Sequence, residues 1–222
     1  LVARNLRVTY DGPDGRVEAV RGIDLDLAPG EAVGLVGASG SGKSSVCAAV
    51  LGLAGPGAQV TADELRFAGR DLLAARRGRH RAAGTPGIAY VPQQPGAALV
   101  PTVAVGRQLA WYLGADVLER HRDELVGLGL DAVLDRPHDL HGAFSGGQLQ
   151  RVVLAVAALG EAPRLLLADE PTSTLDTTTQ ATVLDLIDDL RARLGLAVLH
   201  VSHDLGVVAS RCDRVGVLDA GR

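Results

Sequence analysis

An eight-residue loop, Gly37–Ser44, constrains the fold of this chain more than any other feature of its sequence. The loop reads Gly-Ala-Ser-Gly-Ser-Gly-Lys-Ser and fits the pattern G-x-x-x-x-G-K-[ST] at every position. The continuously apolar run Ala32–Val36 before it is typical of a strand buried on both faces, and a helix is expected from about Lys43 to Leu53. A strand, a glycine-rich loop and a helix in this order predict an α/β fold.

The composition of this loop indicates a phosphate-binding site. Its glycines let the backbone curl so that N–H groups point at phosphate oxygens, and the following helix start adds a partial positive charge. Lys43 is expected to reach the β- and γ-phosphates of a nucleotide, and the Ser44 hydroxyl to ligate Mg²⁺. The alternative is a turn that binds nothing, which the lysine, the hydroxyl and the flanking elements disfavour. The residues expected to contact the nucleotide here are Gly37, Ala38, Ser39, Gly40, Ser41, Gly42, Lys43, Ser44 and Ser45.

A second apolar strand, Arg164–Asp169, places two carboxylates where ligands are expected. Parallel sheets bind ligands at the carboxyl ends of their strands, and Asp169 and Glu170 stand at that end here. Asp169 is expected to hold Mg²⁺, directly or through water. Glu170 is expected to orient or deprotonate the attacking water. A strand that merely ends in solvated acids is the alternative, and the phosphate loop makes the catalytic interpretation the better one.

Apolar periodicity predicts further elements on both sides of the loop. Residues 6–10 and 17–27 alternate between apolar and polar, as half-buried strands do, and residues 102–134 have helical periodicity. Other expected elements are strands at 88–91, 197–201 and 215–218 and helices at 145–159 and 178–194. The pattern predicts a mostly parallel sheet flanked by helices, with an antiparallel β edge. We expect a single domain over residues 1–222, with an α-helical subdomain at about 102–160 inserted into the nucleotide-binding core.

Composition excludes some classes of protein. The chain has 222 residues, 47% of them hydrophobic but only 3% aromatic, so its core must be aliphatic. A net charge of −4 argues against a nucleic-acid partner, and the basic run at 76–81 is expected to be a solvated loop. Two cysteines form no disulfide framework, and no apolar run approaches the ~18–20 residues that span a bilayer. Because the chain starts at Leu1 and contains no Met, we expect it to be a segment of a longer product.

A third motif, Phe144–Gln148, reads Phe-Ser-Gly-Gly-Gln. Ser145 can cap the following helix, and the two glycines let a phosphate approach the exposed N–H groups at the helix start. Alone, the motif would indicate only a well-capped helix. Between the phosphate loop and the acidic strand it matches the L/F-S-G-G-Q signature, and the chain from Leu6 to Arg222 resembles the ABC (ATP-binding cassette) ATPases, a family with the P-loop NTPase fold.

The resemblance implies roles for four more residues. Tyr10 matches an aromatic that stacks on adenine, although a core aromatic is nearly as good an interpretation. Gln93 matches a glutamine that contacts Mg²⁺ or water and senses a transmembrane partner; its neighbour Gln94 is the alternative, and the register from Ile88 to Pro101 favours Gln93. Asp176, in Ser-Thr-Leu-Asp, and His203, in Val-Ser-His-Asp, match the conserved loop aspartate and the switch histidine that contacts the γ-phosphate. The family pairs two such domains head-to-tail, with each ATP between one phosphate loop and the partner's Ser145, Gly146, Gly147 and Gln148.

Local features favour the dipeptide, oligopeptide and nickel importer branch of this family. They are the segments at 15–22, 93–101 and 203–209, while four residues, 141–144, depart from the branch pattern before the signature serine. The resemblance implies an ATPase subunit of an importer on the cytoplasmic face of the membrane. Its partners would be transmembrane permease subunits, a solute-binding protein and a second ATPase domain, which is a second copy, a homologue or another half of one polypeptide. A non-transport ABC ATPase for complex remodelling or metabolism is the alternative. A catalytically inactive half is disfavoured by Glu170 and His203.

Overall fold

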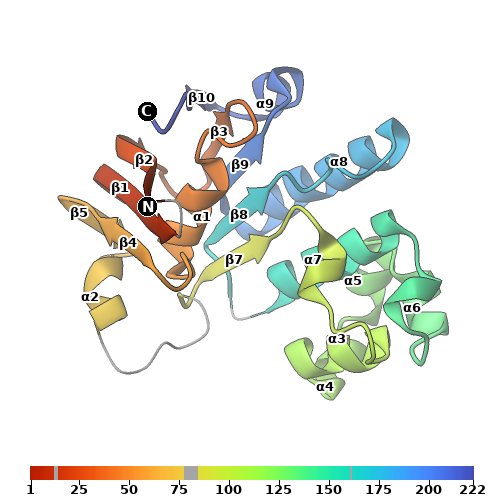
Figure 1. Ribbon diagram of the computed structural model, residues 1–222. Coiled ribbons are helices and arrows are strands. Elements are labelled where there is room, and N and C mark those ends of the chain that lie inside the picture. Colours follow the sequence, from red (N-terminus) through yellow and green to blue (C-terminus); the bar gives the residue numbers. More distant parts are fainter. Residues whose placement is uncertain (13–14, 78–84, 161) are drawn as a thin grey trace.

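The computed structural model describes residues 1–12, 15–77, 85–160 and 162–222, which form two sheets with helices between and beside them (Figure 1). The basic run at 76–81 lies mostly outside these residues. The antiparallel sheet contains β1 (Val2–Gly12), β2 (Gly15–Asp26), β4 (Ala58–Thr61), β5 (Glu64–Phe67) and β6 (Arg70–Asp71). The parallel sheet contains β10 (Arg214–Val217), β3 (Ala32–Val36), β9 (Ala197–Ser202), β8 (Leu165–Asp169) and β7 (Ile88–Val91), in that spatial order.

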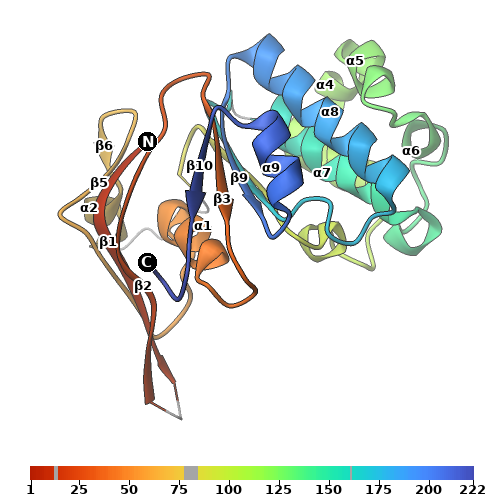
Figure 2. The same cartoon turned by 90° about the horizontal axis from the view of Figure 1, so that it is seen from above.

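The helices form layers around the parallel sheet (Figure 2). Helix α1 (Lys43–Leu51) lies between the two sheets. On the opposite face of the parallel sheet lie α7 (Gly146–Leu159), α8 (Thr177–Leu194) and α9 (Leu205–Arg211). Beyond α7 are the short helices α3 (Val105–Leu113), α4 (Ala115–Arg120), α5 (Arg122–Gly127) and α6 (Asp131–Asp135). The remaining helical segments are α2 (Leu72–Arg77) and the 3₁₀ turns η1 (Pro95–Ala98) and η2 (His141–Ala143).

Two aliphatic cores follow from the two faces of the parallel sheet. Successive side chains of a strand point to opposite faces, so each buried strand serves both cores. In β8, Leu165 and Leu167 pack with α1 and the antiparallel sheet, whereas Leu166 packs with the helices on the other side. In β9, Leu199 and Val198 divide in the same way. The strands that carry the candidate site are thus held between two packed layers.

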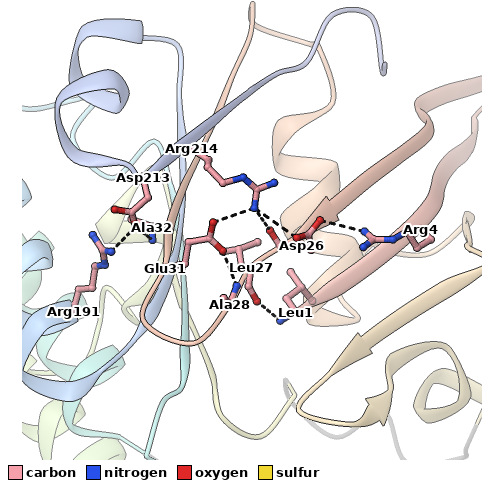
Figure 3. Close-up of polar contacts among 10 residues, drawn as sticks. All are labelled: Leu1, Arg4, Asp26, Leu27, Ala28, Glu31, Ala32, Arg191, Asp213 and Arg214. Atoms are coloured by element: carbon pink, nitrogen blue, oxygen red, sulfur yellow. Dashed lines mark hydrogen bonds and ion pairs between the residues drawn. The ribbon is translucent and has the colours of Figure 1, made fainter.

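Polar contacts fix the start of β3, the strand that leads to the phosphate loop (Figure 3). The Ala32 N–H donates to Asp213 Oδ2 at 2.8 Å, and this carboxylate pairs with Arg191 of α8 at 2.5 Å. Arg214 of β10 pairs with Asp26 of β2 at 3.5 Å. Exposed pairs of this kind each contribute little stability. Together they connect α8, β10 and the antiparallel sheet to the same end of β3.

Most predicted elements are present, with small shifts of their ends. Strand β7 has the bounds expected for it, β8 begins one residue later, and α8 begins one residue earlier than expected. The antiparallel strands form a sheet of their own, because α1 fills the space between them and the parallel sheet. The helical region at 102–134 consists of several short helices. Within the described residues, no helix is both long and apolar enough to cross a membrane.

Candidate active site

The loop between β3 and α1 is shaped by close backbone approaches. A Cβ on Gly37 would lie 2.2 Å from the Leu218 carbonyl oxygen, and one on Gly42 would lie 2.2 Å from that of Ala19. Gly42 also has φ +108°, a conformation that L side chains rarely adopt. Glycine is therefore required at both positions. The curl leaves the N–H groups at the start of α1 without helical partners, as an anion site needs.

Lys43, the only lysine in the sequence, lies inside this curl with 5% of its surface exposed. Its Nζ donates to the carbonyl oxygens of Gly37 at 2.8 Å and Ala38 at 2.9 Å. The same nitrogen lies 3.6 Å from Glu170 Oε1. A buried ammonium needs such partners, because burial without them costs several kcal/mol. The loop thus holds its cation between two backbone carbonyls and a carboxylate.

Each carboxylate oxygen of Asp169, at the end of β8, accepts a hydrogen bond from a hydroxyl group. Ser44 Oγ donates to Oδ1 at 3.1 Å, and Tyr90 Oη donates to Oδ2 at 3.2 Å. Asp169 is 4% exposed, and burial raises the pKa of its carboxyl, while the two hydroxyl hydrogen bonds act in the opposite direction. Burial, followed by the Asp169 charge, raises the pKa of Tyr90, so its phenol remains a donor. Mg²⁺ prefers oxygen ligands, so the Ser44 hydroxyl and the Asp169 carboxylate fit this ion.

Glu170 connects three strands of the parallel sheet. Gln93, which follows β7, donates a hydrogen bond from Nε2 to Glu170 Oε2 at 3.0 Å. His203 follows β9, and its Nδ1 lies 3.2 Å from the same oxygen. The Glu170 φ of +46° is rare for a residue other than glycine. The Glu170 N–H donates to the Val201 carbonyl at 2.9 Å, which holds this conformation. Backbone strain of this kind is concentrated at functional sites.

Tyr10 of β1 lies beside the first turn of α1. Its hydroxyl donates to Ser45 Oγ at 3.3 Å, and its ring packs against the core between the two sheets. The structure therefore places Tyr10 next to the phosphate loop. Tyr10 as a whole is partly exposed.

The signature segment, Phe144–Gln148, lies at the start of α7, apart from the residues around Asp169 and Glu170. Ser145 and Gln148 form a reciprocal cap, in which the Gln148 N–H donates to Ser145 Oγ at 3.2 Å and the Ser145 N–H donates to Gln148 Oε1 at 2.8 Å. Gly146 is exposed, whereas a Cβ on Gly147 would lie 2.4 Å from Thr179 Cγ2 of α8. Asp176 caps α8 by accepting from the N–H groups of Thr178 and Thr179.

The structure thus brings one group of the expected site residues together and leaves another apart. Glu170 contacts Lys43, Gln93 and His203, and the adjacent Asp169 contacts Ser44, the residue after Lys43. The contacts of Ser145, Gln148 and Asp176 are the caps of their own helices. The sequence does not single out Tyr90 as a site residue, because a single tyrosine in a strand is more often a core residue than a partner of a site. Its position three residues before Gln93 is the signal that points to it.

Comparison with known proteins identifies the family. The family model described as ABC transporter matches residues 20–173, more than half of the chain. The chain belongs to the ABC transporter family. This ABC ATPase is 37% identical to the dipeptide transport ATP-binding protein DppD of Bacillus subtilis (strain 168) and to the oligopeptide transport ATP-binding protein OppD of Salmonella typhimurium. Both matches cover 100% of this chain and 68% of the relative, so the chain spans about two thirds of their length.

Solved structures of ABC cassettes match the fold. The dimeric post-hydrolysis state of the ATP-binding cassette MJ0796 bound to ADP and Pi has a TM-score of 0.75 and 26% identity to this ABC ATPase. The match covers 99% of this chain and 94% of the cassette. A second dimeric structure of MJ0796, described as a bacterial ABC transporter cassette, also has a TM-score of 0.75, with 27% identity. The P-loop NTPase fold expected from the sequence is confirmed.

Proposed function

We propose that this ABC ATPase powers a membrane importer of peptides, nickel or similar small solutes, using the site around Glu170. The observation that carries the proposal is the convergence of Lys43, Asp169, Gln93 and His203 on or beside this glutamate. The relatives named as dipeptide and oligopeptide transport proteins support the class of solute.

In this proposal the loop residues bind the phosphates and the acids direct the water. Lys43 moves its Nζ from the loop carbonyls to the β- and γ-phosphates, and Ser44, Asp169 and Gln93 hold Mg²⁺, which neutralises phosphate charge when bound. Glu170 orients a water molecule, which attacks the γ-phosphorus as the bond to the ADP oxygen breaks. The water proton passes to Glu170, and ADP and phosphate are released.

The remaining site residues complete the nucleotide contacts. His203, whose side chain is 61% exposed, is free to turn from Glu170 to the γ-phosphate. Tyr10 stacks on the adenine. Ser145, Gly146, Gly147 and Gln148 act on the ATP of a second, head-to-tail ATPase domain, together with Asp176. That second domain is a second copy of this chain or a homologue.

A cavity beside β7 is the proposed contact with a permease subunit. It has a volume of about 320 Å³, and its lining combines polar surface with the apolar side chains of Ile88, Leu99, Val153, Val156, Ala157 and Pro163. Strand β7 leads from this cavity to Gln93, which contacts Glu170. A segment of the permease that fills the cavity would therefore act on the active site through β7. The assembly lies on the cytoplasmic face of the membrane, and a solute-binding protein delivers the cargo.

Co-purification of the full-length protein from membranes tests this proposal. Recovery with hydrophobic permease subunits supports transport, whereas a soluble complex without them supports an ABC ATPase for remodelling or metabolism. Ala157→Glu places a bulky charge among the apolar side chains of this cavity and should abolish co-purification while the ATPase activity of the isolated protein persists. Ala192→Glu, on the exposed side of α8, is the matched control and should co-purify like the wild type.

A further inference from the structure

Strand β7 and the loop after it each supply a donor to one of two adjacent acids, Asp169 at the end of β8 and Glu170 directly after it. The strands are parallel neighbours, and Tyr90 lies opposite Leu167 in their register. Asp169 follows Leu167 by two residues, so its side chain and that of Tyr90 lie on the same face of the sheet, the face covered by α1. Gln93, three residues after Tyr90, donates to Glu170.

We propose that Tyr90 is a positioning residue that fixes the orientation of the Asp169 carboxylate for metal binding. This inference rests on the Mg²⁺ site of the proposed function. A carboxylate held through one oxygen can still turn about its last side-chain bond. Here Ser44 holds Oδ1 and Tyr90 holds Oδ2, at 3.1 and 3.2 Å, so the plane of the group is fixed from both sides. Hydrogen-bond partners of metal ligands tune metal affinity in this way.

The effect of the Tyr90 hydroxyl on Asp169 can be separated experimentally from that of the Ser44 hydroxyl. Ser44 is itself an expected metal ligand, so its removal would change the ligand set and the orientation of Asp169 together. The Tyr90 hydroxyl contacts Asp169, and its ring packs in the core with Leu165 and Leu167. Tyr90→Phe removes the oxygen and keeps the ring. Since Asp169 is 4% exposed, water has little room to replace the lost donor.

The test is metal binding measured without turnover. The protein is saturated with a non-hydrolysable ATP analogue and titrated with Mn²⁺, whose free concentration is read by electron paramagnetic resonance. Tyr90→Phe should weaken Mn²⁺ binding about tenfold, within the range measured for partners of metal ligands elsewhere. Binding of the analogue in EDTA should remain within about twofold of wild type. Turnover should recover at saturating Mg²⁺, with the Mg²⁺ concentration for half-maximal rate raised about tenfold.

Tyr112→Phe is the matched control, because Tyr112 is exposed on α3, and it should leave Mn²⁺ affinity unchanged. Mn²⁺ affinity of Tyr90→Phe within twofold of wild type would overturn the role of Tyr90. A parallel loss of analogue affinity in EDTA would also overturn it, since that result indicates a damaged fold. If the wild-type protein binds no Mn²⁺ in the presence of the analogue, the proposed metal site itself is wrong, which is a distinct outcome.

Discussion

The phosphate loop and the signature segment satisfy their polar groups in different ways. Around the loop, Lys43 and Asp169 are buried; Lys43 contacts carbonyls of its own loop and the distant Glu170, and Asp169 contacts the distant Ser44 and Tyr90. In the signature segment, Ser145 and Gln148 bond to each other across one helical turn, and Ser145 and Gly146 are exposed. The loop side is a cluster assembled from several strands, whereas the signature side is a preformed helix end that is exposed. The first should bind nucleotide in a single copy, and the second should act only across a dimer.

The largest expected effect is the loss of ATP affinity when the lysine of the phosphate loop is removed. Lys43→Ala removes a buried ammonium from the phosphate position and should lower ATP affinity about 100-fold or more. Isothermal titration checks this, and Arg107→Ala, an exposed cation on α3, should stay within about twofold. Because Lys43 is the only lysine, an amine-reactive label on its side chain should also be blocked by ATP. Micromolar ATP affinity retained in Lys43→Ala would refute the role of the loop lysine.

A charge on the signature side should affect hydrolysis but not binding by one copy. Gly146 is exposed, and a Cβ there would lie at an ordinary 3.5 Å from Leu175, so Gly146→Asp fits. An acid in the first turn also suits the helix dipole, so the fold should persist. Repulsion of a partner's phosphates should lower turnover about 100-fold. Gly142→Asp, exposed and with no atom within 4 Å of the added Cβ, is the matched control. Equal turnover of Gly146→Asp and Gly142→Asp would remove the signature segment from the site.

The smallest expected effect comes from replacing one serine by alanine, either in the signature segment or in the phosphate loop. Ser145→Ala removes a helix cap and should lower the free energy of unfolding by about 1 kcal/mol, measured by urea denaturation. Ser44→Ala removes a proposed metal ligand and should weaken Mn²⁺ binding instead, because Ser44 contacts Asp169 rather than a helix end. The different roles of the two serines would be contradicted if Ser44→Ala lowered the free energy of unfolding as a lost helix cap does. They would also be contradicted if Ser145→Ala left the free energy of unfolding unchanged.

The sequence predicts the parallel core well because local signals there agree. β7 is an apolar strand stopped by Pro92, and β8 is a continuous apolar run that ends in acids. The division of residues 102–134 into short helices was not predicted, although Gly114 and Gly129 have positive φ at two of the breaks. The contact between Tyr90 and Asp169 joins residues 79 positions apart, and only the strand register brings them together. The roles of the site residues stay predictions.

The central claim is that the loop of one copy and the signature segment of another enclose one ATP. Sedimentation of Glu170→Gln tests it most directly, since loss of the water-orienting carboxylate should slow hydrolysis strongly while ATP still binds. With ATP and Mg²⁺ the variant should sediment as a dimer, and Glu170→Gln combined with Gly146→Asp should stay monomeric with ATP bound. A monomeric Glu170→Gln at saturating ATP, or a double variant that dimerises equally well, would contradict the account.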